Sequence, residues 1–376
     1  MKYKLFLLLL CFNVSNFVSA QNKETKPTLQ TDQSGQTGDR LSKAKIEKIE
    51  TEIAAWMAKH KAPALSVAVV ADGQMRFSKG YGLADVENSV PAKADTAYRL
   101  ASIAKSITAT AIMQLVEQGK LDLEAPIQKY CTAYPEKQYP INARQLLTHL
   151  TGIRHNKPEE VFSTKHFSSI NDALSTFKDD ALLHEPELKY SYSTPGYTLL
   201  GCAIEGASGV SYLDYVRENI FKPAGMTRTA ADDVYAVIPN RARGYRKTST
   251  NELQNAPLHD TSIKIPGGGF VSTAEDLAKF TVALNSGKLV KRESLEQMWT
   301  KPKLRDGKES GYAFGFLVGI QNGQRRIFND GSQAGTRTYL FLLPKENFAV
   351  ALMTNLEKAW CEELIPKIMD IVLNEK

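Results

Sequence analysis

A serine followed three residues later by a lysine can form the centre of an acyl-transfer enzyme. On a helix, residues at this spacing share a face, so the lysine amine can reach the serine hydroxyl. If the lysine is desolvated, its pKa falls, and its neutral amine can accept the hydroxyl proton while the serine oxygen attacks a carbonyl carbon. The sequence contains this pattern three times, as Ser42 with Lys45, Ser102 with Lys105 and Ser175 with Lys178.

Only the second pair opens a long apolar helix, which we expect over Ile103 to Gln118. Ser42 precedes a charged helix and is typical of an N-cap, and Ser175 lies in a polar, acidic stretch. At the first turn of a helix, the backbone N–H of Ser102 is free to face a developing oxyanion. The competing interpretation is an N-cap serine with a surface lysine. The apolar flanks favour Ser102 and Lys105 as nucleophile and proton acceptor.

Strand and helix patterns on both sides of this segment must position it. Apolar residues at helical spacing predict helices over about Lys43 to Lys59 and Trp360 to Leu373. Asp72-Gly73 and Asn322-Gly323 predict hairpin turns. The predicted strands are Ala64 to Val70, Gln74 to Gly80, Phe314 to Gln321, Gln324 to Phe328, Thr336 to Leu343 and Ala349 to Thr354.

The order of these elements predicts an α+β fold with three layers. One antiparallel sheet would be covered by the two terminal helices, and a mostly helical lobe would be inserted beside it. We assign about 43–101 and 265–376 to the α/β part and about 102–264 to the lobe, all within one domain over 43–376. No internal repeat is present.

The first residues have the pattern of a cleaved secretory leader. Lys2 and Lys4 precede an apolar run, and small residues end at Ala20. We therefore expect a signal peptide over 1–20, a disordered polar linker over 21–42 and a secreted or periplasmic product. No later segment is long enough to span a membrane.

Charge and cysteine content exclude several other classes. Removing Lys2 and Lys4 lowers the formal charge from +6 to +4, and the basic residues are scattered, so we expect no nucleic-acid partner. After the leader, Cys131, Cys202 and Cys361 remain, an odd number whose pairing stays open. No histidine pair has metalloprotease spacing, and Gly267-Gly268-Gly269 is not followed by Lys-Ser/Thr, so we expect neither a metal nor another cofactor.

Five segments taken together resemble the serine β-lactamase and penicillin-binding protein superfamily, in its class C-like branch. The resemblance covers about Ile46 to Leu373, and YST-x-GYTLL is closest to the animal mitochondrial branch and its bacterial relatives. The segments are YRLASIAK at 98–105, ARQLLTHLTGI at 143–153, YSYSTPGYTLLG at 190–201, PGGGFVSTAED at 266–276 and NDGSQAG at 329–335.

The resemblance implies roles for individual residues. Ser102 would be acylated, and Lys105 would be its proton partner. Tyr192 would act with Lys105 as general base and later activate water. The backbone N–H groups of Ser102 and Ser332 would form the oxyanion hole. A structural tyrosine is the alternative for Tyr192, and we expect His149 to be structural.

Two positions depart from the family pattern. The second motif has Thr194 where asparagine is usual, and the third motif begins with Asn329, followed by Asp330 and Gly331, where a lysine or histidine is usual. In the family that cation helps to hold an anionic substrate group. Arg337 is our hypothesis for a substitute charge.

These features predict a secreted serine hydrolase of the peptidase, D,D-carboxypeptidase or esterase type. Its substrate would be a small molecule or peptide with a scissile amide or ester bond. A catalytically impaired binding or scaffold protein on the same fold is one alternative, supported by Asn329. A true β-lactamase is another. The sequence carries no signal for oligomeric state.

Overall fold

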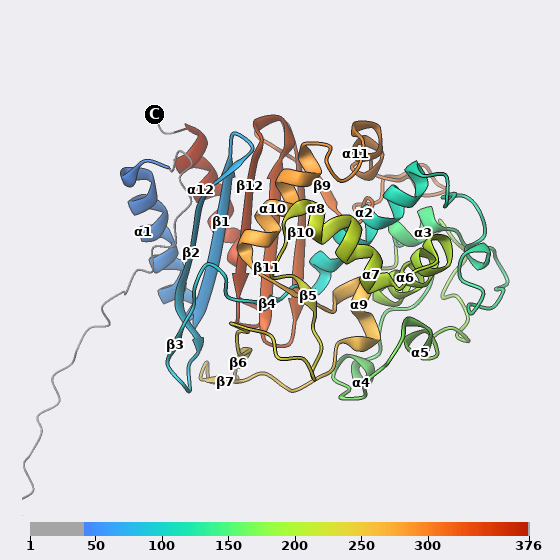
Figure 1. Cartoon of the computed structure of the whole chain (residues 1–376), viewed down its shortest axis with the longest axis horizontal. Coiled ribbons are helices and arrows are strands. Elements are labelled where there is room, and N and C mark those ends of the chain that lie inside the picture. Colours follow the sequence, from blue (N-terminus) through green and yellow to red (C-terminus); the bar gives the residue numbers. More distant parts are fainter. Residues whose placement is uncertain (1–40, 375–376) are drawn as a thin grey trace, which may run out of the picture. The chain divides into compact units, whose positions relative to one another are not determined.

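The computed structural model describes residues 41–374, so the predicted leader and most of the predicted linker lie outside the described residues. A seven-stranded antiparallel sheet with the order β3-β2-β1-β12-β11-β10-β9 forms the centre (Figure 1). Its strands are β1 (Ala64–Ala71), β2 (Gln74–Asp85), β3 (Val90–Pro91), β9 (Leu317–Gln321), β10 (Gln324–Gln333), β11 (Thr336–Leu343) and β12 (Phe348–Thr354).

Both predicted hairpin turns are present. Asp72 and Gly73 have φ values of 53° and 71°, and Asn322 and Gly323 have 49° and 73°, as tight turns between twisted strands require. Three strands differ clearly from their predicted bounds: β2 continues to Asp85, β9 begins at Leu317, and β10 continues to Gln333. β10 is longer because its last residues pair with β11, whereas β9 pairs only with its first part.

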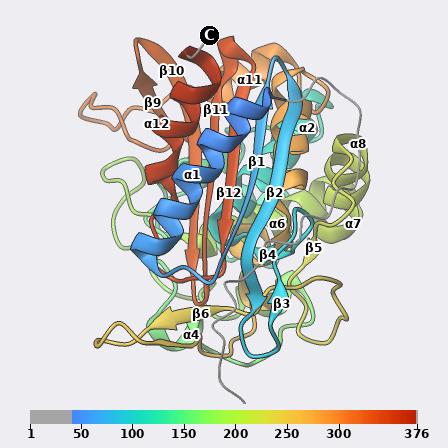
Figure 2. The ribbon, with the colours of Figure 1, turned by 90° about the vertical axis from the view of Figure 1, so that its left-hand side faces the viewer.

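Two helical layers cover the sheet. α1 (Lys43–His60) and α12 (Leu364–Met369) lie side by side on one face (Figure 2), and α2 (Ala104–Glu117) and α10 (Ala274–Asn285) pack on the other. Alternation along β1 serves both layers, since a strand points successive side chains to opposite faces. Leu65, Val67 and Val69 join the core under α1, and Ala64, Ala68 and Val70 join the core under α2.

A mostly helical part lies beside the sheet, on the right of Figure 1, and confirms the predicted α+β class. α6 (Thr194–Ser208) packs against α2 and α9 (Ile265–Gly268) at its centre. The remaining helices are α3 (Ala143–Leu147), α4 (Pro158–Val161), α5 (Ile170–Leu174), α7 (Tyr212–Val216), α8 (Lys222–Ala224) and α11 (Arg292–Met298). The sequence patterns missed β3 and the short strands β4 (Tyr98–Arg99), β5 (Ala230–Ala231), β6 (Tyr245–Lys247), β7 (Leu253–Asn255) and β8 (Phe270–Ser272).

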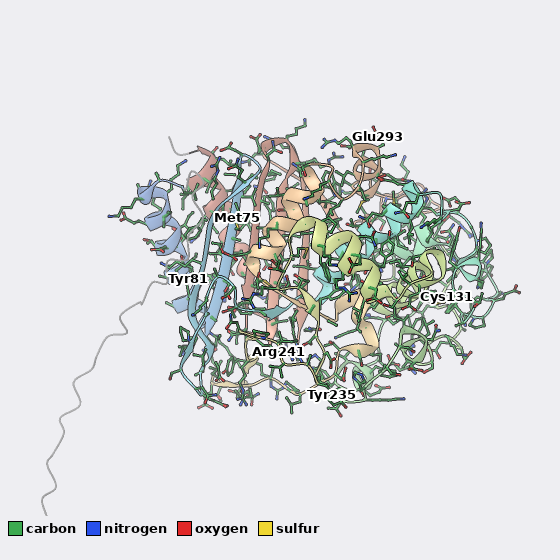
Figure 3. All side chains as sticks on the ribbon, in the orientation of Figure 1. Met75, Tyr81, Cys131, Tyr235, Arg241 and Glu293 are labelled. Atoms are coloured by element: carbon green, nitrogen blue, oxygen red, sulfur yellow. A yellow bond between two sulfur atoms is a disulfide. The ribbon has the colours of Figure 1, made fainter. Side chains whose placement is uncertain are left out.

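A disulfide joins Cys131 to Cys202 within this helical part, where Figure 3 labels Cys131. It ties the segment after α2 to the middle of α6, and Cys361 is a buried free thiol. The cysteine pairing that the sequence left open is thereby resolved. Across residues 41–374, no helix is long and apolar enough to cross a membrane.

Candidate active site

Ser102 lies in a sharp turn between a short strand and the buried helix α2. β4 pairs with β8, and the chain then turns through the 3-10 helix Ala101–Ile103. Ala101 has a φ of 49°, in the left-handed region, which costs a non-glycine residue on the order of 1 kcal/mol. The sequence placed Ser102 in the first turn of a helix. The structure places it in a strained turn just before the α-helix begins.

The structure brings Ser102, Lys105 and Tyr192 together. Lys105 Nζ lies 3.2 Å from Ser102 Oγ, and the Tyr192 hydroxyl donates to the same oxygen over 2.7 Å. Lys105 is fully buried, and its amine also contacts Thr194 Oγ1 at 3.2 Å and the Gly267 carbonyl at 2.6 Å. Ser175, by contrast, is exposed and bonds to the carbonyl of Asp172.

These contacts are compatible with a neutral lysine amine. A neutral amine donates two hydrogen bonds and accepts one, so Lys105 can donate to Gly267 and Thr194 and accept from the Ser102 hydroxyl. The serine oxygen then accepts from Tyr192. In this arrangement the serine proton is directed toward the amine that would accept it.

Electrostatics favour the same protonation states. Burial holds the pKa of Lys105 well below its ordinary value, the positive charge of Lys264 lowers it further, and Asp330 acts in the opposite direction. Burial raises the pKa of Tyr192. At neutral pH, Lys105 is therefore the more available base, and Tyr192 is a neutral hydroxyl that can donate a proton.

Gly267 is required where α9 meets α6. A Cβ atom built on it would lie 2.7 Å from Thr194 Cγ2, closer than packed carbon atoms approach. Its carbonyl is the one acceptor of the Lys105 amine that cannot donate in return. In the sequence this glycine belongs to the PGGGFVSTAED segment that carries the resemblance, but nothing in its spacing points to Lys105.

Strand β10 passes beside the turn that carries Ser102. A Cβ atom on Gly331 would lie 2.2 Å from the Leu100 carbonyl oxygen and 2.2 Å from Thr338 Oγ1, so only glycine allows this approach. Ser332 follows and is exposed. Because β9 pairs only with the first half of β10, no described strand covers the other edge of β10 from Asn329 onward.

Asn329 is buried and fully engaged. Its Nδ2 donates to the Ser102 carbonyl at 3.2 Å, to Ser106 Oγ at 3.0 Å and to the Gly315 carbonyl at 2.9 Å. Its Oδ1 accepts the N–H of Asp330. The asparagine thus connects β10 to the start of α2, and its side chain has no group left over for a substrate.

The structure does not bring Arg337 into contact with this group. Its guanidinium binds Asp330 at 2.7 Å and Glu362 at 2.9 Å, and it stacks over Trp360 on the side of the sheet that faces α12. Two carboxylates already neutralise this buried arginine. Its charge is therefore not free to replace the cation that the third motif lacks.

Two histidines support the segment that carries Tyr192. His149 is buried, its Nδ1 accepts the N–H of Ser193 at 3.1 Å, and its ring packs 4.3 Å from the Tyr192 ring. Nδ1 of His155 accepts the N–H of Thr194 at 3.3 Å. Burial, followed by the charge of Lys105, lowers the pKa of both rings, for His155 to about 4. Both therefore act as neutral acceptors. Sequence spacing gave no signal for His155.

Known proteins are similar to this chain in sequence and in fold. The human mitochondrial serine β-lactamase-like protein LACTB is 32% identical over 380 residues, which cover 76% of this chain and 69% of the relative. The penicillin-binding protein homologue of Pyrococcus abyssi superposes with a TM-score of 0.78 at 27% identity, over 88% of this chain and 78% of that one. The D-amino acid amidase of Ochrobactrum anthropi, at 23% identity and a TM-score of 0.77 over 89% and 100% of the two chains, shares the fold.

The relatives correct one expectation. The leader-like pattern predicted a secreted or periplasmic product, but the human, bovine and mouse relatives, which are 31–32% identical, are mitochondrial proteins. Secretion is therefore not supported. The physical reason for the error is that a basic residue pair and a short apolar run define only a leader-like pattern, and that segment lies outside the described residues.

The family assignment follows from the extent of the match. The β-lactamase family profile matches residues 49–365, which include all five segments that carry the resemblance. The mixed α/β architecture with its antiparallel sheet agrees with this match. The architecture is a serine hydrolase-like fold. The chain belongs to the β-lactamase family.

Proposed function

We propose that this protein is a serine hydrolase that cleaves an amide or ester bond through an acyl-enzyme on Ser102. One observation carries the proposal: the Ser102 hydroxyl lies within hydrogen-bond distance of both the buried Lys105 amine and the Tyr192 hydroxyl. A base and an acid on one nucleophile are what acyl transfer requires. The proposed substrate is a small molecule or peptide with a scissile amide or ester.

The proposed reaction has two half-reactions. Ser102 gives its proton to Lys105 as Oγ attacks the carbonyl carbon, and the backbone N–H groups of Ser102 and Ser332 stabilise the oxyanion. One such donor is worth roughly two to three orders of magnitude in rate. Tyr192 protonates the departing amine or alkoxide and regains its proton from Lys105. Water, activated by the same two groups, then releases the acid and restores Ser102.

Covalent labelling tests the proposal. Incubation with a fluorophosphonate probe should label Ser102, and Ser102→Ala should abolish the label. Ser175→Ala is a matched control, because it removes the serine of another Ser-x-x-Lys pair on an exposed surface. A folded protein that neither labels nor hydrolyses activated esters would instead support a scaffold role, and rapid nitrocefin turnover would support a β-lactamase.

A further inference from the structure

Lys264 is a buried lysine without a partner. It ends the 3-10 helix Ser262–Lys264, just before α9, and only 7% of its surface is exposed. Its amine has no hydrogen bond or ion pair with any residue in 41–374. Burying an unpaired ammonium group is costly, and such groups in folded proteins are normally paired. This position therefore calls for an anion.

The side chain of Lys264 lies next to the nucleophile turn. A Cβ atom built on Gly268 would be 3.7 Å from the Ala101 carbonyl group and 3.8 Å from Lys264 Cδ, so the lysine stem passes close to the residue before Ser102. After burial, the positive charge of Lys264 is the strongest influence that lowers the pKa of Lys105.

The two carboxylates that bind the chain segment just before Lys264 are already engaged. Asp232 is buried, binds Arg99 at 2.8 Å and is shared with Arg241, which Figure 3 labels. Asp260 binds His166 at 2.8 Å and accepts the backbone N–H of Ser262.

The other basic groups that interact electrostatically with Lys264 are either paired or neutral. Arg99 of β4 binds Asp232, the Lys105 amine of α2 is held by Thr194 and Gly267, and the rings of His155 and His259 are neutral because burial lowers their pKa. Asp330, the remaining acid that acts on Lys105, is bound to Arg337.

We propose that Lys264 binds a carboxylate of the substrate that acylates Ser102, and so supplies the cation that Asn329 and Arg337 do not. This inference rests on the proposed function. One free ammonium matches one negative charge, whereas a phosphate dianion would need a second free cation, and Lys105 is committed to the serine. Burial and Arg99 lower the pKa of Lys264 to about 8, so most of it stays charged at neutral pH.

Paired esters test the proposal. The mono-4-nitrophenyl esters of succinate, glutarate and adipate carry a free carboxylate at three different distances from the scissile ester. Their 4-nitrophenyl methyl diesters have the same chain lengths but no charge. We expect Lys264→Met to lower the ratio of kcat/KM for the mono-acid ester over the diester by about 10- to 100-fold, at the chain length for which this ratio is highest in the wild type. Loss of one charge-assisted hydrogen bond predicts this size of effect, and the change should lie mainly in KM. Lys264→Arg should restore most of it. Any effect on Lys105 itself cancels in the ratio.

Two controls sharpen the result. Lys120→Met removes an exposed lysine and should leave the ratio unchanged. Arg337→Ala removes the rival cation, and we expect no change because two carboxylates neutralise it. An unchanged ratio in Lys264→Met, or a drop in Arg337→Ala alone, would overturn the proposal.

A binding experiment separates this inference from the proposed function. In Ser102→Ala, which cannot turn over, glutarate should raise the thermal midpoint, and the added Lys264→Met change should remove that shift. If wild-type protein hydrolyses no ester yet Ser102→Ala binds glutarate through Lys264, the hydrolase proposal fails and the anion site stands. If Ser102→Ala shows no Lys264-dependent binding and the ester ratios do not change, the anion site is wrong.

Discussion

The pH dependence of stability gives a quantitative test of Lys264 burial. Its pKa falls from an ordinary 10.5 to about 8 in the folded protein, chiefly through burial and then through Arg99. Below pH 8, both folded and unfolded chains hold the proton, and the full cost of the buried charge is present. Between pH 8 and 10.5, the unfolded chain retains a proton that the folded chain has released, so the free energy of unfolding rises with pH.

The magnitude follows from that interval. At about 1.4 kcal/mol per pH unit, the change from 10.5 to about 8 corresponds to about 3 kcal/mol. The Lys264→Met variant lacks this pH-dependent contribution. The difference in free energy of unfolding, wild type minus variant, should therefore rise by about 3 kcal/mol between pH 8 and pH 10.5.

Denaturant unfolding of both proteins at closely spaced pH values from 7 to 10.5 measures the difference. Lys120→Met serves as the control, and its difference from wild type should stay flat, since that lysine is exposed. A flat difference for Lys264→Met as well would refute the reasoning, because it would mean that the Lys264 amine is solvated or paired in the folded protein.

Three further predictions concern the site. Tyr192→Phe should lower ester kcat/KM by about 100- to 10,000-fold, the usual range for a lost general acid, while ring packing on His149 keeps the protein folded, as circular dichroism would verify. Gly331→Ala should lower the thermal midpoint and ester activity together, because its Cβ would meet the Leu100 carbonyl at 2.2 Å, and an unaltered midpoint would contradict that geometry. In the pH profile of kcat/KM for a neutral ester, the acid limb should report deprotonation of Lys105 and lie well below pH 10.5. It should move to higher pH in Lys264→Met, because the charge of Lys264 lowers the pKa of Lys105. A limb that moves to lower pH would contradict this.

Much of the architecture is encoded locally. Asp72-Gly73 and Asn322-Gly323 specify hairpins because asparagine, aspartate and glycine tolerate positive φ, and both turns have it. Strand alternation and helical spacing predicted six of the seven strands of the sheet and the two terminal helices that cover one face. The end of β10 was missed because Asn329, Asp330 and Gly331 have little strand propensity, and pairing with β11 overrides it.

The sequence by itself identified the three residues of the candidate site. Ser102, Lys105 and Tyr192 were named from residue type, apolar context and resemblance, and the structure brings them within hydrogen-bond distance. These features are readable because the serine and lysine are local to one turn and helix, and the tyrosine lies in a specific motif.

Only the tertiary structure decided which charges are free. Arg337 is the cation that the sequence favoured, and Asp330 and Glu362 neutralise it. Lys264, far from Ser102 along the chain, is buried beside the nucleophile turn without a counter-ion. The physical reason is that ion pairing depends on which distant segments pack together, and residue type and spacing along the chain carry no information about that packing.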